Sequence, residues 1–163
     1  MYRHIDSGHD ERERRAARPC GLPADALAFF TAQLAFRTDV SDVYGALDAD
    51  EPGFTLVDSR GKAAWDQGRA PGAVHLPTDE IASRAAELVD PSQPVVVYCW
   101  GPGCNGAYRA AVEFAKLGYQ VKEMIGGMEY WIREGLPVAT DAGVERGEPD
   151  PRTVPVTGVS CAC

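Results

Sequence analysis

Short apolar runs alternate with segments at helical spacing through the middle of the chain, and this alternation constrains the fold most. The runs are of strand length and are bounded by glycine, proline or polar residues. We expect strands at residues 54–57, 73–76, 95–98 and 121–125. We expect helices at residues 62–67, 78–89, 106–117 and 128–133. Strands separated by helices favour an α/β fold with a central, mostly parallel sheet and helices on both faces.

The two ends of the chain differ from this centre. Residues 1–21 are charged, whereas residues 22–36 carry apolar side chains at helical spacing and are predicted to form a helix. That helix either covers the surface of the domain or forms a dimer contact. Ser41 and Thr78 are predicted N-caps of helices that run to residues 47 and 89. After Thr140 the chain is polar and irregular, which is typical of a tail.

Composition and charge narrow the function classes. The 163 residues suffice for one domain plus tails, and 45% apolar with 25% charged residues is typical of soluble globular proteins. The net charge of −8 disfavours nucleic acid and anionic membranes as partners, because phosphate binding needs a basic surface. No apolar run reaches the length of a membrane span, and the polar N-terminus lacks a secretory signal, so we expect a cytoplasmic protein. The five cysteines are unevenly spread and do not indicate a secreted disulfide framework.

Cys99 ends an apolar strand, and a glycine-rich loop and a helix follow it. In open α/β sheets ligands bind at the carboxyl ends of strands, which is where this thiol falls. Glycines let successive backbone N–H groups converge on one point, and the helix N-terminus adds partial positive charge there. We therefore predict that Cys99 is a nucleophile whose thiolate the loop stabilises. The predicted binding loop consists of Trp100, Gly101, Pro102, Gly103, Cys104, Asn105 and Gly106.

Three further motifs flank this loop. They are the strand end Asp58-Ser59-Arg60, the segment 65–77 with its Gly-Arg-Ala-Pro-Gly-Ala stretch, and the segment 126–131 that begins Gly-Gly and ends in Trp. Together with the strand-end cysteine, and in this order, they resemble a single-domain member of the rhodanese-like (sulfurtransferase) family. The resemblance covers about residues 40–140. We expect an N-terminal extension with a helix (1–36), a rhodanese-like domain (37–140) and a polar C-terminal tail (141–163).

The resemblance implies sulfur transfer through a persulfide on Cys99 and implies no cofactor. The donor would be a small sulfur-containing anion or a persulfide, and the acceptor a small thiol, a protein thiol or cyanide. The chain departs from the family pattern at several positions. Arg69 stands where the family has His, and Pro102 and Cys104 stand where common members have Gly and Arg. The Ala-Ala pair of the following helix also comes about two residues late, so we expect a longer loop with a changed rim.

Several polar residues near these motifs are candidates for supporting roles. Asp58 and Arg60 are predicted to form an ion pair that holds the strand end, with Arg60 adding positive potential near the site. Arg69 is a further supporting candidate. His75 lies inside an apolar strand, so we expect a hydrogen-bonded and partly buried imidazole rather than a general base. Arg109 is predicted to lie on the far side of the first helical turns. Of the tryptophans, Trp100 is the candidate for a pocket wall, and Trp131 for the core.

The remaining cysteines allow more than one interpretation. Cys104 lies five residues after Cys99, and it is either a second thiol that attacks an oxidised or sulfurated Cys99 or a small residue that fits a tight helix start. Cys161 and Cys163 are incidental thiols, a mobile redox or sulfur-relay dithiol, or, least favoured, part of a metal site. We predict no metal site.

Three functional classes therefore remain. A sulfurtransferase is favoured because the nucleophile is present. A phosphatase or arsenate reductase on a related fold would need an arginine six positions after the cysteine, where Asn105 stands, and this class is disfavoured. The third class is a non-catalytic or redox-sensing module that uses the pocket or the pair formed by Cys99 and Cys104.

Overall fold

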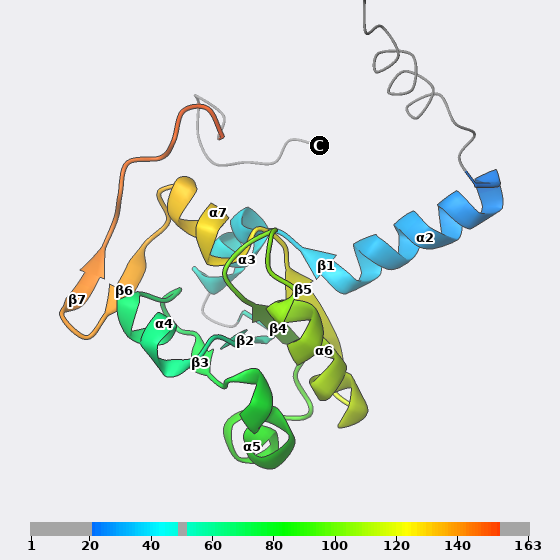
Figure 1. The fold of residues 1–163 in the computed structure, drawn as a ribbon, viewed down its shortest axis with the longest axis horizontal. Coiled ribbons are helices and arrows are strands. Elements are labelled where there is room, and N and C mark those ends of the chain that lie inside the picture. The colour runs from blue at the N-terminus through cyan, green and yellow to red at the C-terminus, as the bar shows by residue number, and fades with distance from the viewer. Residues whose placement is uncertain (1–20, 49–51, 154–163) are drawn as a thin grey trace, which may run out of the picture. The chain divides into compact units, whose positions relative to one another are not determined.

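The centre of the fold is a five-stranded sheet in which all neighbouring strands are parallel. The computed structural model describes residues 21–48 and 52–153, so the predictions for residues 1–20, Cys161 and Cys163 lie outside the described residues. The strands lie in the order β1-β5-β4-β2-β3. Their bounds are β1 Arg37–Thr38, β2 Thr55–Asp58, β3 Val74–His75, β4 Val95–Tyr98 and β5 Val121–Met124. The predicted parallel α/β sheet is confirmed (Figure 1).

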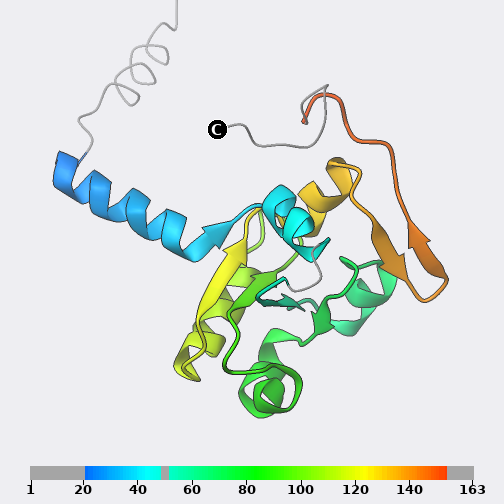
Figure 2. The ribbon, with the colours of Figure 1, turned by 180° about the vertical axis from the view of Figure 1, so that it is seen from behind.

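Helices cover both faces of this sheet and form two cores (Figure 1, and from behind in Figure 2). One core is formed with α5 (Ile81–Leu88) and α6 (Gly106–Lys116), and the other with α3 (Val40–Leu47) and α7 (Gly127–Arg133). Because side chains alternate along a strand, the central strand β4 contributes to both. Val95, Val97 and Cys99 belong to the first core, and Val96 and Tyr98 to the second. This alternation directs the Cys99 side chain toward α5 and α6.

The helices follow the predicted bounds closely, but two predicted N-caps are wrong. Helix α4 (Lys62–Gln67) has the predicted bounds. Helix α3 is capped by Asp39, whose carboxylate accepts a hydrogen bond from the Asp42 amide at 2.8 Å, and Ser41 lies inside the helix. A carboxylate at the cap also complements the positive end of the helix dipole. Thr78 opens a 3₁₀ turn, η1 (Thr78–Glu80), and α5 begins only after it.

Three strands have no counterpart in the sequence prediction. The edge strand β1 has only two residues, which is too short for an alternating pattern to be recognised. Strands β6 (Val138–Thr140) and β7 (Gly143–Glu145) form an antiparallel hairpin across the predicted domain end at residue 140, and only β7 lies in the segment predicted to be an irregular tail. The residues of β7 are all exposed, so this strand carries no apolar face that the sequence could reveal.

The predicted N-terminal helix is present as α2 (Pro23–Phe36). Among the residues that the structure describes, no helix combines the length and the apolarity needed to cross a bilayer. The boundaries at residues 36 and 140 stay predictions.

Candidate active site

Cys99 lies at the carboxyl end of the central strand, and its backbone is held by α7. The Cys99 carbonyl accepts a hydrogen bond from the Met128 amide at 3.0 Å, and the Trp100 carbonyl accepts one from the Glu129 amide at 2.7 Å. The first turn of α7 approaches so closely that a Cβ on Gly127 would lie 2.6 Å from the Cys99 oxygen. The Cys99 residue is 8% exposed. The thiol is therefore nearly buried, and two backbone hydrogen bonds from α7 hold the chain at Cys99 and Trp100.

The loop after Cys99 folds back and brings a second thiol against the first. The Cys104 amide donates to the Gly101 carbonyl at 3.0 Å, which closes a tight turn. The two sulfur atoms, Cys99 Sγ and Cys104 Sγ, lie 3.1 Å apart. The Gly106 amide donates to Cys104 Sγ at 3.3 Å, and a Cβ on Gly106 would overlap the Cys99 sulfur. Only glycine therefore fits where the helix begins beside the thiols.

The two thiols differ in which protonation state their surroundings favour. Burial and the hydrogen bond with Cys104 raise the pKa of Cys99 to about 11, against a weaker opposite effect of the Trp100 amide. The pKa of Cys104 is lowered, first by the hydrogen bond from Cys99 and then by the Gly106 amide. The expectation that the loop stabilises the Cys99 thiolate is therefore wrong for the resting pair. Of the two thiols, the surroundings favour the thiolate of Cys104 over that of Cys99.

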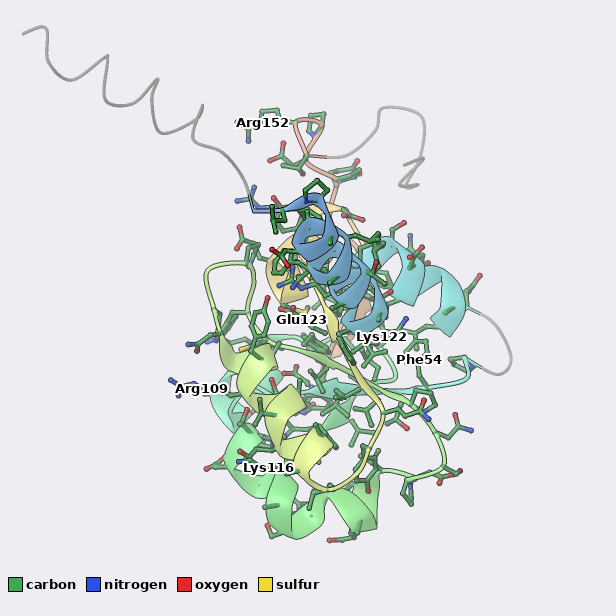
Figure 3. All side chains as sticks on the ribbon, turned by 90° about the vertical axis from the view of Figure 1, so that its right-hand side faces the viewer. Phe54, Arg109, Lys116, Lys122, Glu123 and Arg152 are labelled. Carbon is green, nitrogen blue, oxygen red and sulfur yellow. The ribbon has the colours of Figure 1, made fainter. Side chains whose placement is uncertain are left out.

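An open cavity of about 540 Å³ lies in front of Cys104. Cys104, Asn105 and Gly106 form one side of it, and Ser59, Thr78 and Arg109 contribute to its lining. The prediction for Arg109 is wrong, because its position one turn into α6 places it on the side of the helix that faces the cavity rather than on the far side. Its positive charge also lowers the pKa of Cys104. Figure 3 shows Arg109 reaching outward from the N-terminal part of α6.

The ion pair predicted at the end of β2 is present and buried. Arg60 donates to both Asp58 oxygens, with Nη2 to Oδ2 at 2.6 Å, and Nη2 also donates to the Gly68 carbonyl at 2.7 Å. Burial alone would lower the pKa of Arg60, but the hydrogen bond to Asp58 and its charge raise it. The guanidinium lies 4.6 Å from the centroid of the Trp100 ring. The pair thus connects the end of β2 to the start of the thiol loop.

Arg69 lies apart from the thiols. It pairs with Asp141 at 2.9 Å and lies over the Trp65 ring at 4.5 Å. Its backbone bridges to Ala139 beside the β6–β7 hairpin, and this bridge draws Arg69 toward the hairpin instead of the loop. His75 Nε2 donates a hydrogen bond to the Arg60 carbonyl at 2.9 Å, and its ring stacks on Trp65, as its predicted structural role requires.

The other predicted loop residues point in different directions. Trp131 is fully buried, as predicted, whereas Trp100 is 46% exposed beside Arg60 and is not among the residues that line the cavity. Gly101 lies against Glu129, since a Cβ there would meet that side chain. Pro102 lines a second hollow of about 370 Å³, together with Tyr108 and Tyr130.

Within the described part of the chain, no three His, Cys, Asp or Glu side chains gather as metal ligands would.

Sequence reasoning missed part of the cavity wall. Ser59 and Thr78 line it together with Arg109, and all three were absent from the predicted binding residues. Ser59 donates to the Tyr98 carbonyl at 2.7 Å, so it also joins the ends of β2 and β4. Its position between Asp58 and Arg60, at the carboxyl end of a strand, was the available signal, because that edge of the sheet is where ligands bind.

Comparison with known proteins identifies the family. The sequence model of the Rhodanese-like domain matches residues 39–134, and the chain belongs to this family. The chain is 34% identical over 96 residues to a protein named Sulfurtransferase from Allochromatium vinosum, which covers 58% of this chain and 87% of that one. It is 37% identical over 91 residues to thiosulfate sulfurtransferase GlpE from Actinobacillus succinogenes, which covers 55% of this chain and 79% of that one.

A third relative has a different name. The chain is 35% identical over 133 residues to the HTH-type transcriptional regulator Rv0324 of Mycobacterium tuberculosis, and the match covers 82% of this chain. The match spans only 53% of that regulator, so the chain corresponds to about half of its length. Among solved structures, the BH2092 protein from Bacillus halodurans superimposes with a TM-score of 0.69 at 34% identity, covering 75% of this chain and 89% of that one.

Proposed function

We propose that the protein is a sulfurtransferase that carries sulfane sulfur as a persulfide on Cys99. The observation that carries the proposal is the placement of the Cys99 thiol at the carboxyl end of β4, beside a second thiol that opens onto a cavity. The relatives named as sulfurtransferases support the same chemistry. The sulfur donor is a small anion such as thiosulfate, or a persulfide, and the acceptor is a thiol or cyanide.

The sulfur-loading step needs a Cys99 thiolate, and Cys104 provides the means to form it. Cys104 Sγ lies 3.1 Å from Cys99 Sγ, and the lowered pKa of Cys104 favours its thiolate as the acceptor of the Cys99 proton. As a donor binds, the proton moves to Cys104 and the Cys99 thiolate attacks the outer sulfur. Thiosulfate then leaves as sulfite, and Cys99 carries the persulfide anion. Once formed, the Cys99 thiolate is a strong nucleophile, because the nucleophilicity of a thiolate rises with its basicity.

The cavity in front of Cys104 suits a small anionic donor. Arg109 supplies positive charge there, and the protein as a whole is acidic, so binding depends on this local charge. Two carboxylates, Asp79 and Glu113, also line the cavity. Because these carboxylates repel anions, the cavity suits a compact anion held near Arg109 and the loop better than a large anion that reaches Asp79 and Glu113.

A thiocyanate assay with thiosulfate as donor and cyanide as acceptor tests this proposal. We expect the wild-type protein to form thiocyanate when thiosulfate and cyanide are supplied, and Cys99→Ser to form none. Arg109→Gln keeps both thiols and serves as the matched control, with activity reduced but measurable. Thiocyanate production by Cys99→Ser near the wild-type rate would contradict the proposal. Circular dichroism of the Cys99→Ser variant checks that the fold is kept.

A redox-sensing module is the second candidate function. The observation that favours it is the 3.1 Å contact between Cys99 Sγ and Cys104 Sγ, since two thiols so close form a disulfide readily on oxidation. The relative named as a transcriptional regulator also fits a regulatory role. Two separate measurements discriminate the two functions: mild peroxide without any sulfur donor, and the thiocyanate assay without peroxide. A sensor forms its disulfide rapidly in the first and makes no thiocyanate in the second, whereas a sulfurtransferase makes thiocyanate.

A further inference from the structure

We propose that Cys104 attacks the Cys99 persulfide, releases hydrosulfide and leaves a disulfide between Cys99 and Cys104. The protein would then reduce sulfane sulfur to sulfide as well as transfer it. This inference rests on the proposed function, because it begins from the Cys99 persulfide. It assigns to Cys104 a chemical step of its own.

The geometry already places the second thiol for this step. Cys104 Sγ lies 3.1 Å from Cys99 Sγ, within the near-attack range of reacting atoms. A disulfide bond is about 2.05 Å long, so the sulfurs need to approach by only about 1 Å. The residue that makes this approach is Cys104, which sits in a turn flanked by Gly101 and Gly103 and is partly exposed. Cys99 is held in place by the two backbone hydrogen bonds to α7.

The atoms and charges balance over the two steps. In the first, the Cys99 thiolate bonds to the outer sulfur of thiosulfate, the sulfur–sulfur bond of the donor breaks, and sulfite leaves with the electron pair. In the second, Cys104 sulfur bonds to the Cys99 sulfur and the persulfide bond breaks. The outer sulfur leaves with that electron pair and with the Cys104 proton, as hydrosulfide. The outer sulfur is reduced, and the two cysteine thiols are oxidised to the disulfide.

The same proton serves both steps. Of the two thiols, Cys104 is the one whose thiolate is favoured, because the contact with Cys99 and the Gly106 amide both lower its pKa. It accepts the Cys99 proton when the donor is attacked, and it passes that proton to the departing sulfur when it attacks in turn. Arg109 at the cavity lowers the pKa of Cys104 as well, which favours release of the proton in the second step.

An external thiol is the co-reactant that restores the pair. Cys104 lines the cavity, whereas Cys99 is 8% exposed behind it. A small thiol therefore attacks the Cys104 sulfur, forms a mixed disulfide there and frees the Cys99 thiolate. A second equivalent of thiol then releases Cys104 and leaves as the oxidised disulfide of the reductant. The direction of this attack follows from exposure alone.

A single-turnover experiment on the full chain tests the inference. The other three cysteines, Cys20, Cys161 and Cys163, are replaced by Ser so that any disulfide reports on the pair. The reduced protein is freed of thiol and mixed with thiosulfate or with inorganic polysulfide. Released sulfide is trapped with monobromobimane, and the protein mass is followed with time. Cys104→Ser and Cys104→Ala are measured in the same background.

We expect the protein with both thiols to release one sulfide for each disulfide formed. The disulfide is seen as a loss of two hydrogen atoms from the protein mass. The Cys104 variants should load more slowly, gain one sulfur atom and hold it, with a persulfide lifetime at least about 100-fold longer, because the intramolecular attack is lost. Peptide mapping should show Cys99 joined to Cys104.

Equal persulfide lifetimes with and without Cys104 would overturn the inference and leave the sulfurtransferase proposal standing. So would sulfide release without a matching disulfide. If no form of the protein gains sulfur from either donor, the proposed function fails, and this inference fails with it. The Cys104 variants distinguish the two failures, because they show the loaded persulfide directly. The stoichiometry in the protein with both thiols gives an answer even if a variant fails to fold.

Discussion

Removing Arg60 from its buried ion pair with Asp58 should destabilise the protein far more than removing Lys62 from an exposed ion pair of nearly the same N–O distance. Arg60 Nη2 and Asp58 Oδ2 lie 2.6 Å apart, with side chains 1% and 0% exposed. Lys62 Nζ and Asp66 Oδ1 lie 2.5 Å apart, with side chains 72% and 43% exposed. The two pairs have nearly equal lengths and opposite environments. Arg60→Ala and Lys62→Ala therefore separate the effect of burial from the effect of distance.

The magnitude follows from what each substitution leaves behind. Arg60→Ala leaves the Asp58 carboxylate buried and without its counter-ion, and leaves the Gly68 carbonyl without its donor. Breaking a buried pair in this way costs about 3–5 kcal/mol. Lys62→Ala leaves a carboxylate that water solvates, for about 0.5 kcal/mol or less. For a chain of this size the first change lowers the melting temperature by about 6–20 °C, and the second by roughly 2 °C at most.

Urea denaturation at neutral pH, followed by circular dichroism, measures both free energies of unfolding. Asp58→Asn with Arg60→Met completes the set, because replacing both charges should recover part of the loss. Recovery identifies the unpaired buried charge, rather than lost packing, as the origin of the instability. The reasoning is refuted if Arg60→Ala lies within about 1 kcal/mol of the wild type, or if it equals Lys62→Ala.

Three further predictions concern the loop and its neighbours. At about pH 8, iodoacetamide should modify Cys104 before Cys99, and modification of Cys99 should rise only as the pH approaches 11, which peptide mapping across a pH series checks. Arg109→Gln should raise KM for thiosulfate by about 2–5-fold with a smaller change in kcat, as expected for one exposed charge, and steady-state thiocyanate assays measure this. Gly127→Ala should cost more than about 2 kcal/mol, because its φ is +55° and a Cβ there meets the Cys99 carbonyl, whereas Gly45→Ala, with open space and a helical position, should stabilise by about 0.5–1 kcal/mol. Chemical denaturation of both glycine variants compares them, and equal effects would contradict the proposed contact.

The order and type of the central elements were predictable because each carries a long apolar signal. The four residues of β4 are all buried, and such a run is recognisable without structural information. The position of Cys99 at the end of that strand followed directly. Capping was less predictable, since Asp39 and Ser41 both have side chains suited to an N-cap and lie two residues apart. Only the local backbone path decides between them.

The electrostatics of the site could not be derived from residue spacing. Loop amides and a helix N-terminus suggested a Cys99 thiolate, but the pKa of Cys99 is raised and that of the neighbouring Cys104 is lowered. The outcome depends on a 3.1 Å contact and on burial, which are properties of the folded loop. Arg69 illustrates the same limit. Its place in a family motif suggested a role near the thiols, whereas the unpredicted β6–β7 hairpin supplies Asp141 as its partner.

The two hydrogen bonds from α7 to the backbone at Cys99 and Trp100 divide the loop into a stationary and a moving part. Any movement that changes the distance between the two sulfur atoms is therefore made by Cys104. Substitutions at the start of α7, about thirty residues further along the chain, therefore reach the thiol chemistry through Met128 and Glu129 without touching either sulfur. Evolution can adjust how long the protein holds a sulfur atom by varying a helix that the substrate never meets.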